Sequence, residues 1–203
     1  MAIKLYDAVP SSNSDRVKIA LNEKGLAYER VTLDLARRDQ KRPEFLKLNP
    51  YGKVPVIDDG GKVLFESCII NEYLDERYPD PPLMPKDPHL RGRGRVISDY
   101  GLNHLHEPYW ALRNEIFFKK ESERNAPLME EKRGALRELL RYLEDALGDK
   151  PYFLGEFSLT DVALWPRFGR MMDYGVLPAA ALPRLGAWCE RMKSRPSIKT
   201  LAG

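Results

Sequence analysis

The fold is most clearly predicted by one stretch of the sequence, Asn49-Pro-Tyr-Gly-Lys-Val-Pro-Val-Ile-Asp-Asp-Gly-Gly-Lys-Val-Leu-Phe-Glu-Ser67. Two apolar runs in it, Val54–Ile57 and Lys62–Phe65, flank Asp-Asp-Gly-Gly, and glycines between two such runs are typical of a tight β-hairpin. A helix is expected next, with four apolar residues on one face: Ile69, Ile70, Tyr73 and Leu74. The stretch therefore predicts the order strand, strand, helix.

Another group of elements precedes this stretch. Ile3 and Leu5 alternate with polar residues and predict a strand that ends near Tyr6. Apolar residues at helical spacing predict a helix from about Ser12 to Lys24, with Gly25 at its end. Residues 28–33 predict a second strand. The first 78 residues are thus expected to form an α/β domain with the order β-α-β, then β-β-α.

A proline-rich segment separates these elements from the rest of the chain. Residues 79–88 hold five of the 16 prolines, which excludes a helix interior or a central strand and predicts an extended linker. The pattern in residues 89–203 is helical, with an apolar stripe at Leu136, Leu139, Leu140, Leu143 and Leu147. Ser158-Leu-Thr-Asp161 predicts a capping box at another helix start. We therefore expect an all-α second domain.

Composition excludes several classes of protein. The 203 residues are 43% hydrophobic, and 33 basic against 30 acidic side chains leave a net charge of +3, so a disordered chain and a nucleic-acid binder are both disfavoured. Two cysteines are too few for a disulfide framework and suit a reducing compartment. No apolar run reaches 18 residues and no signal-peptide pattern is present, so we expect a cytoplasmic protein without a membrane span.

The first candidate for a functional segment is the loop Val9-Pro-Ser-Ser-Asn-Ser-Asp-Arg16, which leads into the first predicted helix. Its serines are N-cap candidates, and the same free amides and hydroxyls can instead stabilise an anion such as a bound thiolate. Lowering a thiol pKa by two units requires about 2.7 kcal/mol, which one hydrogen bond and the helix dipole can supply. The loop contains no cysteine, so the reactive sulfur has to come from a ligand.

Two further segments complete a candidate site. A cis peptide bond between Val54 and Pro55 would expose the backbone of Val54 to an extended peptide ligand. Glu66-Ser67 enters the next helix, where Ser67 is either a helix cap or, with Glu66, a site for the carboxylate and ammonium groups of a ligand. A peptide with a central thiol and an amino-acid head would be complementary to all three segments: the serine loop, the Val54 backbone and Glu66-Ser67.

Over essentially its whole length the sequence resembles the cytosolic glutathione S-transferases. Four motifs in family order carry the resemblance: Ser11-Ser-Asn-Ser-Asp-Arg-Val-Lys-Ile-Ala-Leu21 with Glu23-Lys-Gly25, Leu48-Asn-Pro-Tyr-Gly-Lys-Val-Pro55, Glu66-Ser67 with the following Ile-Ile-Asn-Glu-Tyr-Leu74, and Gly155-Glu-Phe-Ser-Leu-Thr-Asp161. The resemblance implies a thioredoxin-like domain, an all-helical domain, a homodimer, and attack by the glutathione thiol on a small hydrophobic electrophile. No metal is expected, because His89, His104 and His106 have no carboxylate or thiol partner at ligand spacing.

The resemblance also assigns roles to residues. Ser11 matches the catalytic serine of the zeta and tau classes, counted five residues before Arg16, and Ser12 is the alternative because delta-like classes count four. Where this chain has Asn13, the zeta class has a cysteine, which argues against the maleylacetoacetate isomerase activity of that class, one of the alternative functions.

The remaining matched positions bind glutathione. Val54, beside the cis-proline Pro55, matches the residue whose backbone pairs with the ligand. Glu66-Ser67 matches the γ-glutamyl site, and Lys53 and Gln40 are additional candidates for the carboxylate end of the ligand. Four residues are expected on one helix that contributes to the pocket for the electrophile, or to the core: Tyr100, His104, Tyr109 and Trp110.

A second resemblance points to a different function. Ile70-Asn-Glu-Tyr-Leu-Asp-Glu-Arg-Tyr-Pro-Asp-Pro-Pro-Leu-Met-Pro85 is similar to stringent starvation protein A, a glutathione-transferase-like bacterial protein that binds RNA polymerase. That protein carries Pro-His-Pro where this chain has Pro79-Asp80-Pro81. A non-enzymatic partner of RNA polymerase is therefore the main alternative, and a redox or dehalogenase-type relative is another.

Overall fold

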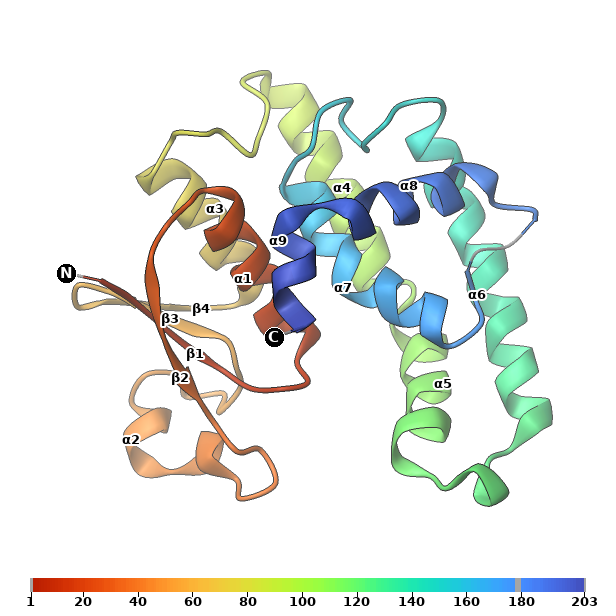
Figure 1. Ribbon diagram of the computed structural model, residues 1–203, viewed down its shortest axis with the longest axis horizontal. Helices are drawn as coiled ribbons and strands as arrows, with labels where there is room; N and C mark the ends of the chain where they lie inside the picture. Colours follow the sequence, from red (N-terminus) through yellow and green to blue (C-terminus); the bar gives the residue numbers. More distant parts are fainter. Residues whose placement is uncertain (1, 178–179, 203) are drawn as a thin grey trace. The chain divides into compact units, whose positions relative to one another are not determined.

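The computed structural model describes residues 2–177 and 180–202 (Figure 1). The contacts divide the chain into two units, one formed by Met1–Leu83 and Pro196–Gly203 and the other by Met84–Arg195. The first unit contains a four-stranded sheet and the second is helical. The predicted combination of a thioredoxin-like α/β domain with an all-α domain is confirmed.

The sheet has the strand order β2-β1-β3-β4, formed by β1 (Ile3–Asp7), β2 (Tyr28–Thr32), β3 (Val56–Asp59) and β4 (Lys62–Phe65). β1 pairs parallel with β2 and antiparallel with β3, and β3 pairs antiparallel with β4. The turn between β3 and β4 is the predicted two-residue one. Gly60 and Gly61 have φ values of 61° and 94°, a conformation that glycine adopts without a steric penalty.

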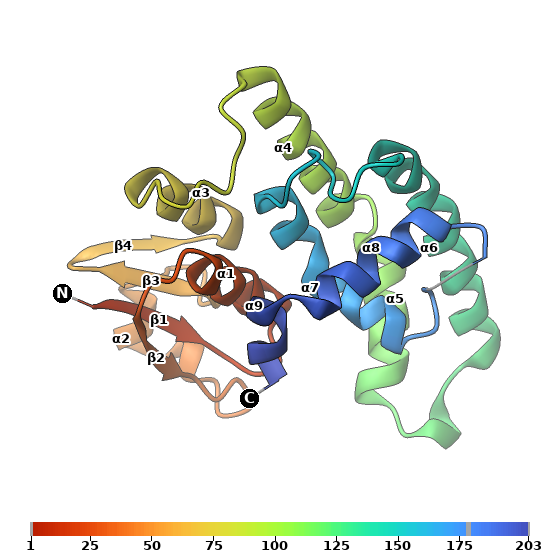
Figure 2. The same ribbon diagram turned by 45° about the horizontal axis from the view of Figure 1, so that its top comes forward.

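Helices cover both faces of this sheet (Figure 2). On one face α1 (Ser12–Glu23) and α3 (Ser67–Arg77) pack on the strands through a core of Ile3, Leu5, Val17, Leu21, Ile57, Ile70 and Leu74. On the other face α2 (Pro43–Leu46), which follows the 3-10 helix η1 (Asp39–Lys41), contributes Phe45 to a smaller core. These two layers hold the starts of α1 and α3 at fixed positions.

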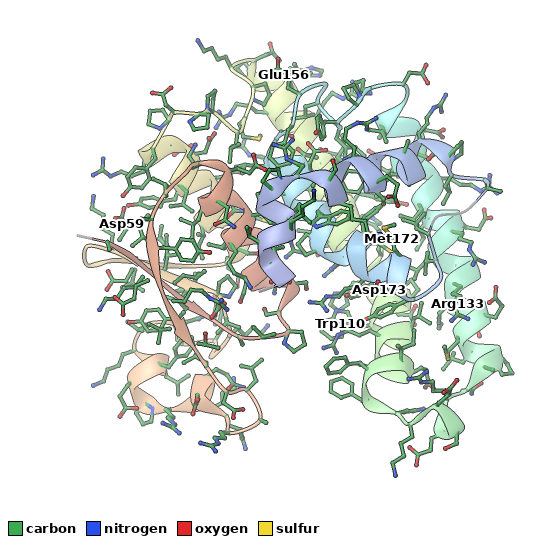
Figure 3. All side chains as sticks on the ribbon, in the orientation of Figure 1. Asp59, Trp110, Arg133, Glu156, Met172 and Asp173 are labelled. Carbon is green, nitrogen blue, oxygen red and sulfur yellow. The ribbon has the colours of Figure 1, made fainter. Side chains whose placement is uncertain are left out.

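The hairpin end and the start of the linker are held to the first unit by polar side chains. Asp59, which is labelled in Figure 3, accepts hydrogen bonds from the phenols of Tyr73 (2.7 Å) and Tyr78 (3.0 Å). Lys24 and Asp75 form a buried ion pair of 2.8 Å. The Lys24 ammonium also donates to the Pro81 carbonyl, and the Asp75 carboxylate accepts from the Leu83 amide. The segment that follows α3 is therefore anchored as far as Leu83.

The helical unit contains five α-helices and one 3-10 helix within its described residues: α4 (Pro88–Asn103), α5 (His106–Phe118), η2 (Glu121–Glu123), α6 (Ala126–Leu147), α7 (Leu159–Asp173) and α8 (Pro183–Ser194). α5 packs on α6 and α4 packs on α7. At the end of α7, the guanidinium group of Arg133 of α6, labelled in Figure 3, donates to the Tyr174 carbonyl at 2.8 Å. The predicted leucine stripe lies on α6, with Leu139 only half-buried.

The predicted capping box starts α7. The Asp161 carboxylate accepts hydrogen bonds from the Ser158 amide (3.0 Å), the Ser158 hydroxyl (2.9 Å), the Trp188 indole (2.8 Å) and the Phe153 amide (3.3 Å). All four residues are buried. This cluster joins α7 to α8 in the centre of the unit, so its role is structural.

The end of the chain differs from the sequence-based division, which places all of residues 89–203 in the helical domain. α9 (Pro196–Lys199) and η3 (Thr200–Ala202) pack against α1 instead. The Ser197 hydroxyl donates to Glu23, and the Asn22 amide donates to the Thr200 hydroxyl at 3.0 Å. The segment is too short to carry a periodic signal, so its partner could not be predicted.

Three local predictions are wrong. β3 begins at Val56 rather than Val54, since the ladder with β1 starts beyond Pro55. Ile69 is 58% exposed, whereas Ile70 and Leu74 are buried in the core between α3 and the sheet and Tyr73 packs against that core. Tyr100 lies on α4, but Tyr109 and Trp110 lie on α5, because the chain bends at His104 and Leu105.

Candidate functional site

The serine loop forms the start of α1. Ser11 is the N-cap, and its hydroxyl oxygen accepts a hydrogen bond from the Ser14 amide at 3.2 Å. Ser12 is the first helical residue, and both serines are partly exposed. Because a serine hydroxyl can accept one hydrogen bond and donate another, Ser11 retains its proton for a ligand while it caps the helix.

The loop before β3 presents the backbone of Val54. The Val54–Pro55 peptide bond is cis, as the site hypothesis requires. The Asn49 side chain holds the loop, since its amide donates to the Lys53 carbonyl at 2.7 Å and its oxygen accepts from the Tyr51 amide at 2.9 Å. Val54 makes no backbone–backbone hydrogen bond within the described residues. Its amide and carbonyl groups are therefore available to an extended peptide.

The start of α3 is formed by Glu66 and Ser67. Glu66 is the N-cap residue and has a φ of 71°, which a non-glycine residue rarely adopts and which is often found at functional sites. Ser67 is the first residue of the helix, so the alternative in which Ser67 caps the helix is wrong. The first amides of α3 have no partner within the helix and favour an anion at this end.

These segments meet at one small cavity of about 70 Å³ in the first unit. Its lining residues are Asn13, Asn49, Lys53, Val54, Pro55, Glu66 and Ser67. Five of the eight predicted site residues thus surround one space, with a carboxylate from Glu66 and an ammonium group from Lys53. A ligand that carries both an ammonium and a carboxylate group is complementary to this lining.

The other three predicted residues do not line the cavity. Ser11 and Ser12 precede the lining residue Asn13 in the chain. Gln40 lies in η1, where its carbonyl oxygen is 2.8 Å from the position that a Cβ on Gly52 would occupy. This close approach, together with the positive φ of Gly52, requires glycine and holds η1 beside the loop that presents Val54.

Three residues near the cavity were not among the predicted site residues. Asn13 and Asn49 line it, and the buried Arg16 donates hydrogen bonds to Asn13 and Ser67. Asn49 could have been found from the Asn-Pro turn that it begins. Asn13 and Arg16 carry no such signal, since their proximity to Ser67 depends on the packing of α1 against α3.

No cysteine or histidine is among the residues that line this cavity. Cys68 and Cys189 are free thiols, and burial raises the pKa of both. Among the described residues, no group of three or more His, Cys, Asp and Glu side chains could hold a metal ion. None of the helices in the described ranges has the length and apolar character that a membrane crossing requires.

Two family models match the chain. Residues 1–76 match the N-terminal domain of glutathione S-transferase, and residues 126–191 match its C-terminal domain. The first match contains every segment that lines the cavity, and the second contains the capping box at Ser158. This chain belongs to the glutathione S-transferase family.

Individual relatives extend this result over the whole chain. The stringent starvation protein A homolog of Pasteurella multocida is 34% identical over 93% of this chain and 84% of its own length. Glutathione S-transferase U19 of Arabidopsis thaliana is 32% identical over 96% of this chain and 86% of its own length. The structure is similar to the theta class glutathione S-transferase of Xanthomonas axonopodis pv. citri with glutathione bound, with a TM-score of 0.86, 28% identity and coverage of 98% and 96% of the two chains.

Proposed function

We propose that this protein is a serine-type glutathione transferase that binds glutathione in the cavity beside Val54 and Ser67. The observation that carries the proposal is the meeting of a free extended backbone at Val54, a carboxylate at Glu66 and the start of α3 around one space. Family membership and the glutathione-bound relative support it. The cysteinyl backbone of glutathione pairs with Val54, and its γ-glutamyl head lies at Glu66-Ser67.

The proposed chemistry begins with the thiol of the ligand. Ser11 donates a hydrogen bond to the sulfur, which favours the thiolate over the thiol, and the thiol proton leaves to solvent. The thiolate then attacks an electrophilic carbon of a small hydrophobic substrate. For an activated aryl halide, the sulfur–carbon bond forms, the carbon–halogen bond breaks, and the halide leaves with the bonding electron pair. Ser12 is the alternative donor.

The cellular setting proposed here is that of the family. We propose a cytoplasmic homodimer with glutathione as co-substrate and a small hydrophobic electrophile as second substrate. Lys53 and Gln40 are proposed for the carboxylate end of glutathione, since Lys53 lines the cavity and Gln40 lies beside the same loop.

Calorimetric titration with glutathione tests the binding step. We expect saturable binding by the full chain, and conjugation of glutathione to an activated chloronitrobenzene, followed by absorbance. Glu66→Gln removes the charge that faces the ligand ammonium group and is expected to weaken binding by about tenfold. Absence of binding by the unmodified protein would contradict the proposal.

The similarity to stringent starvation protein A homologs favours a second candidate function, that of a non-enzymatic partner of RNA polymerase. The two candidates predict opposite results in one pull-down experiment. A transferase is retained on immobilised glutathione and does not co-purify with RNA polymerase, whereas the polymerase partner co-purifies and is not retained. Retention on glutathione without turnover of any electrophile would favour a glutathione-binding regulator.

A further inference from the structure

A buried network of ion pairs lies between the first turns of α1 and the end of β1. Lys18 of α1 is only 5% exposed, and its ammonium group lies 2.8 Å from the Asp15 carboxylate and 3.7 Å from the Asp7 carboxylate. Asp7 ends β1, is fully buried, and also accepts hydrogen bonds from Arg30 at 2.9 Å and Thr32 at 3.1 Å, both in β2. Lys18 thus connects the end of β1 to the first turn of α1.

This connection holds both ends of the loop that carries Ser11. Only three residues separate Asp7 from Ser11, and the Asp15 amide donates to the Ser11 carbonyl at 2.9 Å. One carboxylate precedes the loop and the other follows it, and the same ammonium group is paired with both. The buried side chain of Lys18 therefore fixes the position of Ser11 relative to the strand.

The same network determines the charge close to the proposed thiolate. Asp15 follows Ser11 by four residues, a spacing that brings side chains to the same side of a helix. A negative charge in this first turn opposes the positive potential by which a helix start favours an anion. Lys18 compensates the charge of Asp15, and Arg30 compensates that of Asp7. The network of two carboxylates and two cations is therefore neutral as a whole.

We propose that Lys18 is a positioning residue that holds the donor serine in place and keeps the charge of Asp15 from opposing the thiolate of bound glutathione. This inference rests on the proposed function. It requires the thiol pKa to follow the net charge of the network, although neither residue is among those that line the cavity. The charged residues at or beside the cavity, Lys53, Glu66 and the buried Arg16, are retained in every variant of the test.

The test follows the ultraviolet absorbance of the bound thiolate while the full chain, saturated with glutathione, is titrated with base. Lys18→Met removes one positive charge and keeps most of the side-chain volume, and it is expected to raise the thiol pKa by about 0.5–1 unit. Asp15→Asn removes one negative charge and is expected to lower the thiol pKa by about the same amount. The double variant restores the net charge, so its thiol pKa is expected to return to within about 0.3 units of that of the unmodified protein.

A stability measurement distinguishes this role from a purely structural one. Both single variants lose the same 2.8 Å ion pair, so both are expected to lower the free energy of unfolding in urea, whereas their thiol pKa values are expected to move in opposite directions. Lys18→Arg keeps the charge and is expected to keep the thiol pKa of the unmodified protein. Lys4→Met is the matched control, because Lys4 pairs with Glu29 at 4.0 Å on an exposed part of the same sheet, and it is expected to leave the thiol pKa unchanged.

The outcomes separate this inference from the function on which it rests. Unmodified protein that does not bind glutathione overturns the proposed function and the inference with it. Unmodified protein that binds glutathione, with Lys18→Met and Asp15→Asn variants whose thiol pKa is unchanged or moves in the same direction, overturns the inference alone. If Lys18→Met does not fold, Asp15→Asn decides: a lowered thiol pKa supports the inference, and an unchanged or raised one overturns it.

Discussion

Two helices in this molecule begin with a serine N-cap and differ in their hydrogen bonding. Ser11-Ser-Asn-Ser14 begins α1, and Ser158-Leu-Thr-Asp161 begins α7. At α7, Ser158 and Asp161 are buried and the carboxylate accepts from four donors. At α1, Ser11 and Asn13 are accessible and each has donor groups that no described residue uses. A serine-led helix start is structural where its polar groups are saturated and is available to a ligand where they are not.

The largest expected effect is a loss of stability on substitution of Asp161, the carboxylate that accepts four hydrogen bonds at the start of α7. Asp161→Ala leaves the buried indole of Trp188 and the amides of Phe153 and Ser158 without an acceptor, and we expect it to lower the free energy of unfolding by about 3 kcal/mol or more. Urea denaturation measures this. Asp145→Ala, on the exposed side of α6, is the matched control, and an equal effect of both substitutions would contradict the structural role of Asp161.

The next effect concerns catalysis at the accessible helix start. If Ser11 lowers the thiol pKa by two units, Ser11→Ala raises the pKa of bound glutathione to about 8.5 and decreases turnover at pH 7 by about 25-fold, because the thiolate fraction falls from about three quarters to a few per cent, with affinity mostly kept. Loss of the cap is also expected to lower the free energy of unfolding by about 1 kcal/mol. Ser12→Ala tests the alternative donor, and a loss of turnover in that variant alone would assign the role to Ser12. Unchanged turnover in both variants rules out a serine donor.

A smaller effect is the pH dependence of stability that the buried Asp161 carboxylate contributes. Burial raises the pKa of Asp161 from its usual 3.8 to about 6, against the effect of its four hydrogen bonds. Between these values the folded chain binds more protons than the unfolded chain, so this group makes stability fall as pH rises. We expect the difference in unfolding free energy between unmodified protein and Asp161→Asn to decrease from pH 4 to pH 6. A difference that increases over this range would show that the hydrogen bonds dominate.

The smallest effect distinguishes two buried serines. The hydroxyl of Ser14 is buried and has no hydrogen-bond partner among the described residues, whereas the hydroxyl of Ser158 donates to Asp161. Ser14→Ala removes an unsatisfied polar group and improves helix propensity, so we expect a gain of about 0.5 kcal/mol in stability. Ser158→Ala is expected to lose about 1 kcal/mol. Destabilisation by both substitutions would mean that Ser14 has a partner in solution.

Local signals explain why the elements themselves could be predicted. The glycines at 60 and 61, the leucine spacing on α6 and the serine and aspartate of the α7 capping box act over a few residues, so they are legible in the sequence. Features without such a local signal were predicted wrongly. No pattern marks the bend at His104, so α4 and α5 were predicted as one helix. The short α9 belongs to this group as well, because only its contacts with α1 assign it to the first unit.

The sequence by itself determined the fold class, the hairpin, the cis-proline segment and the family motifs, because short-range patterns and matched motifs define them. Only the tertiary structure decided which polar side chains share a cavity. It placed Asn13 with Ser67 through Arg16, across 51 residues of sequence, and left Gln40 outside the lining. The physical reason is that donors and acceptors from distant segments are paired by the packing of α1 and α3 on one sheet, and no local pattern records which of them remain unpaired.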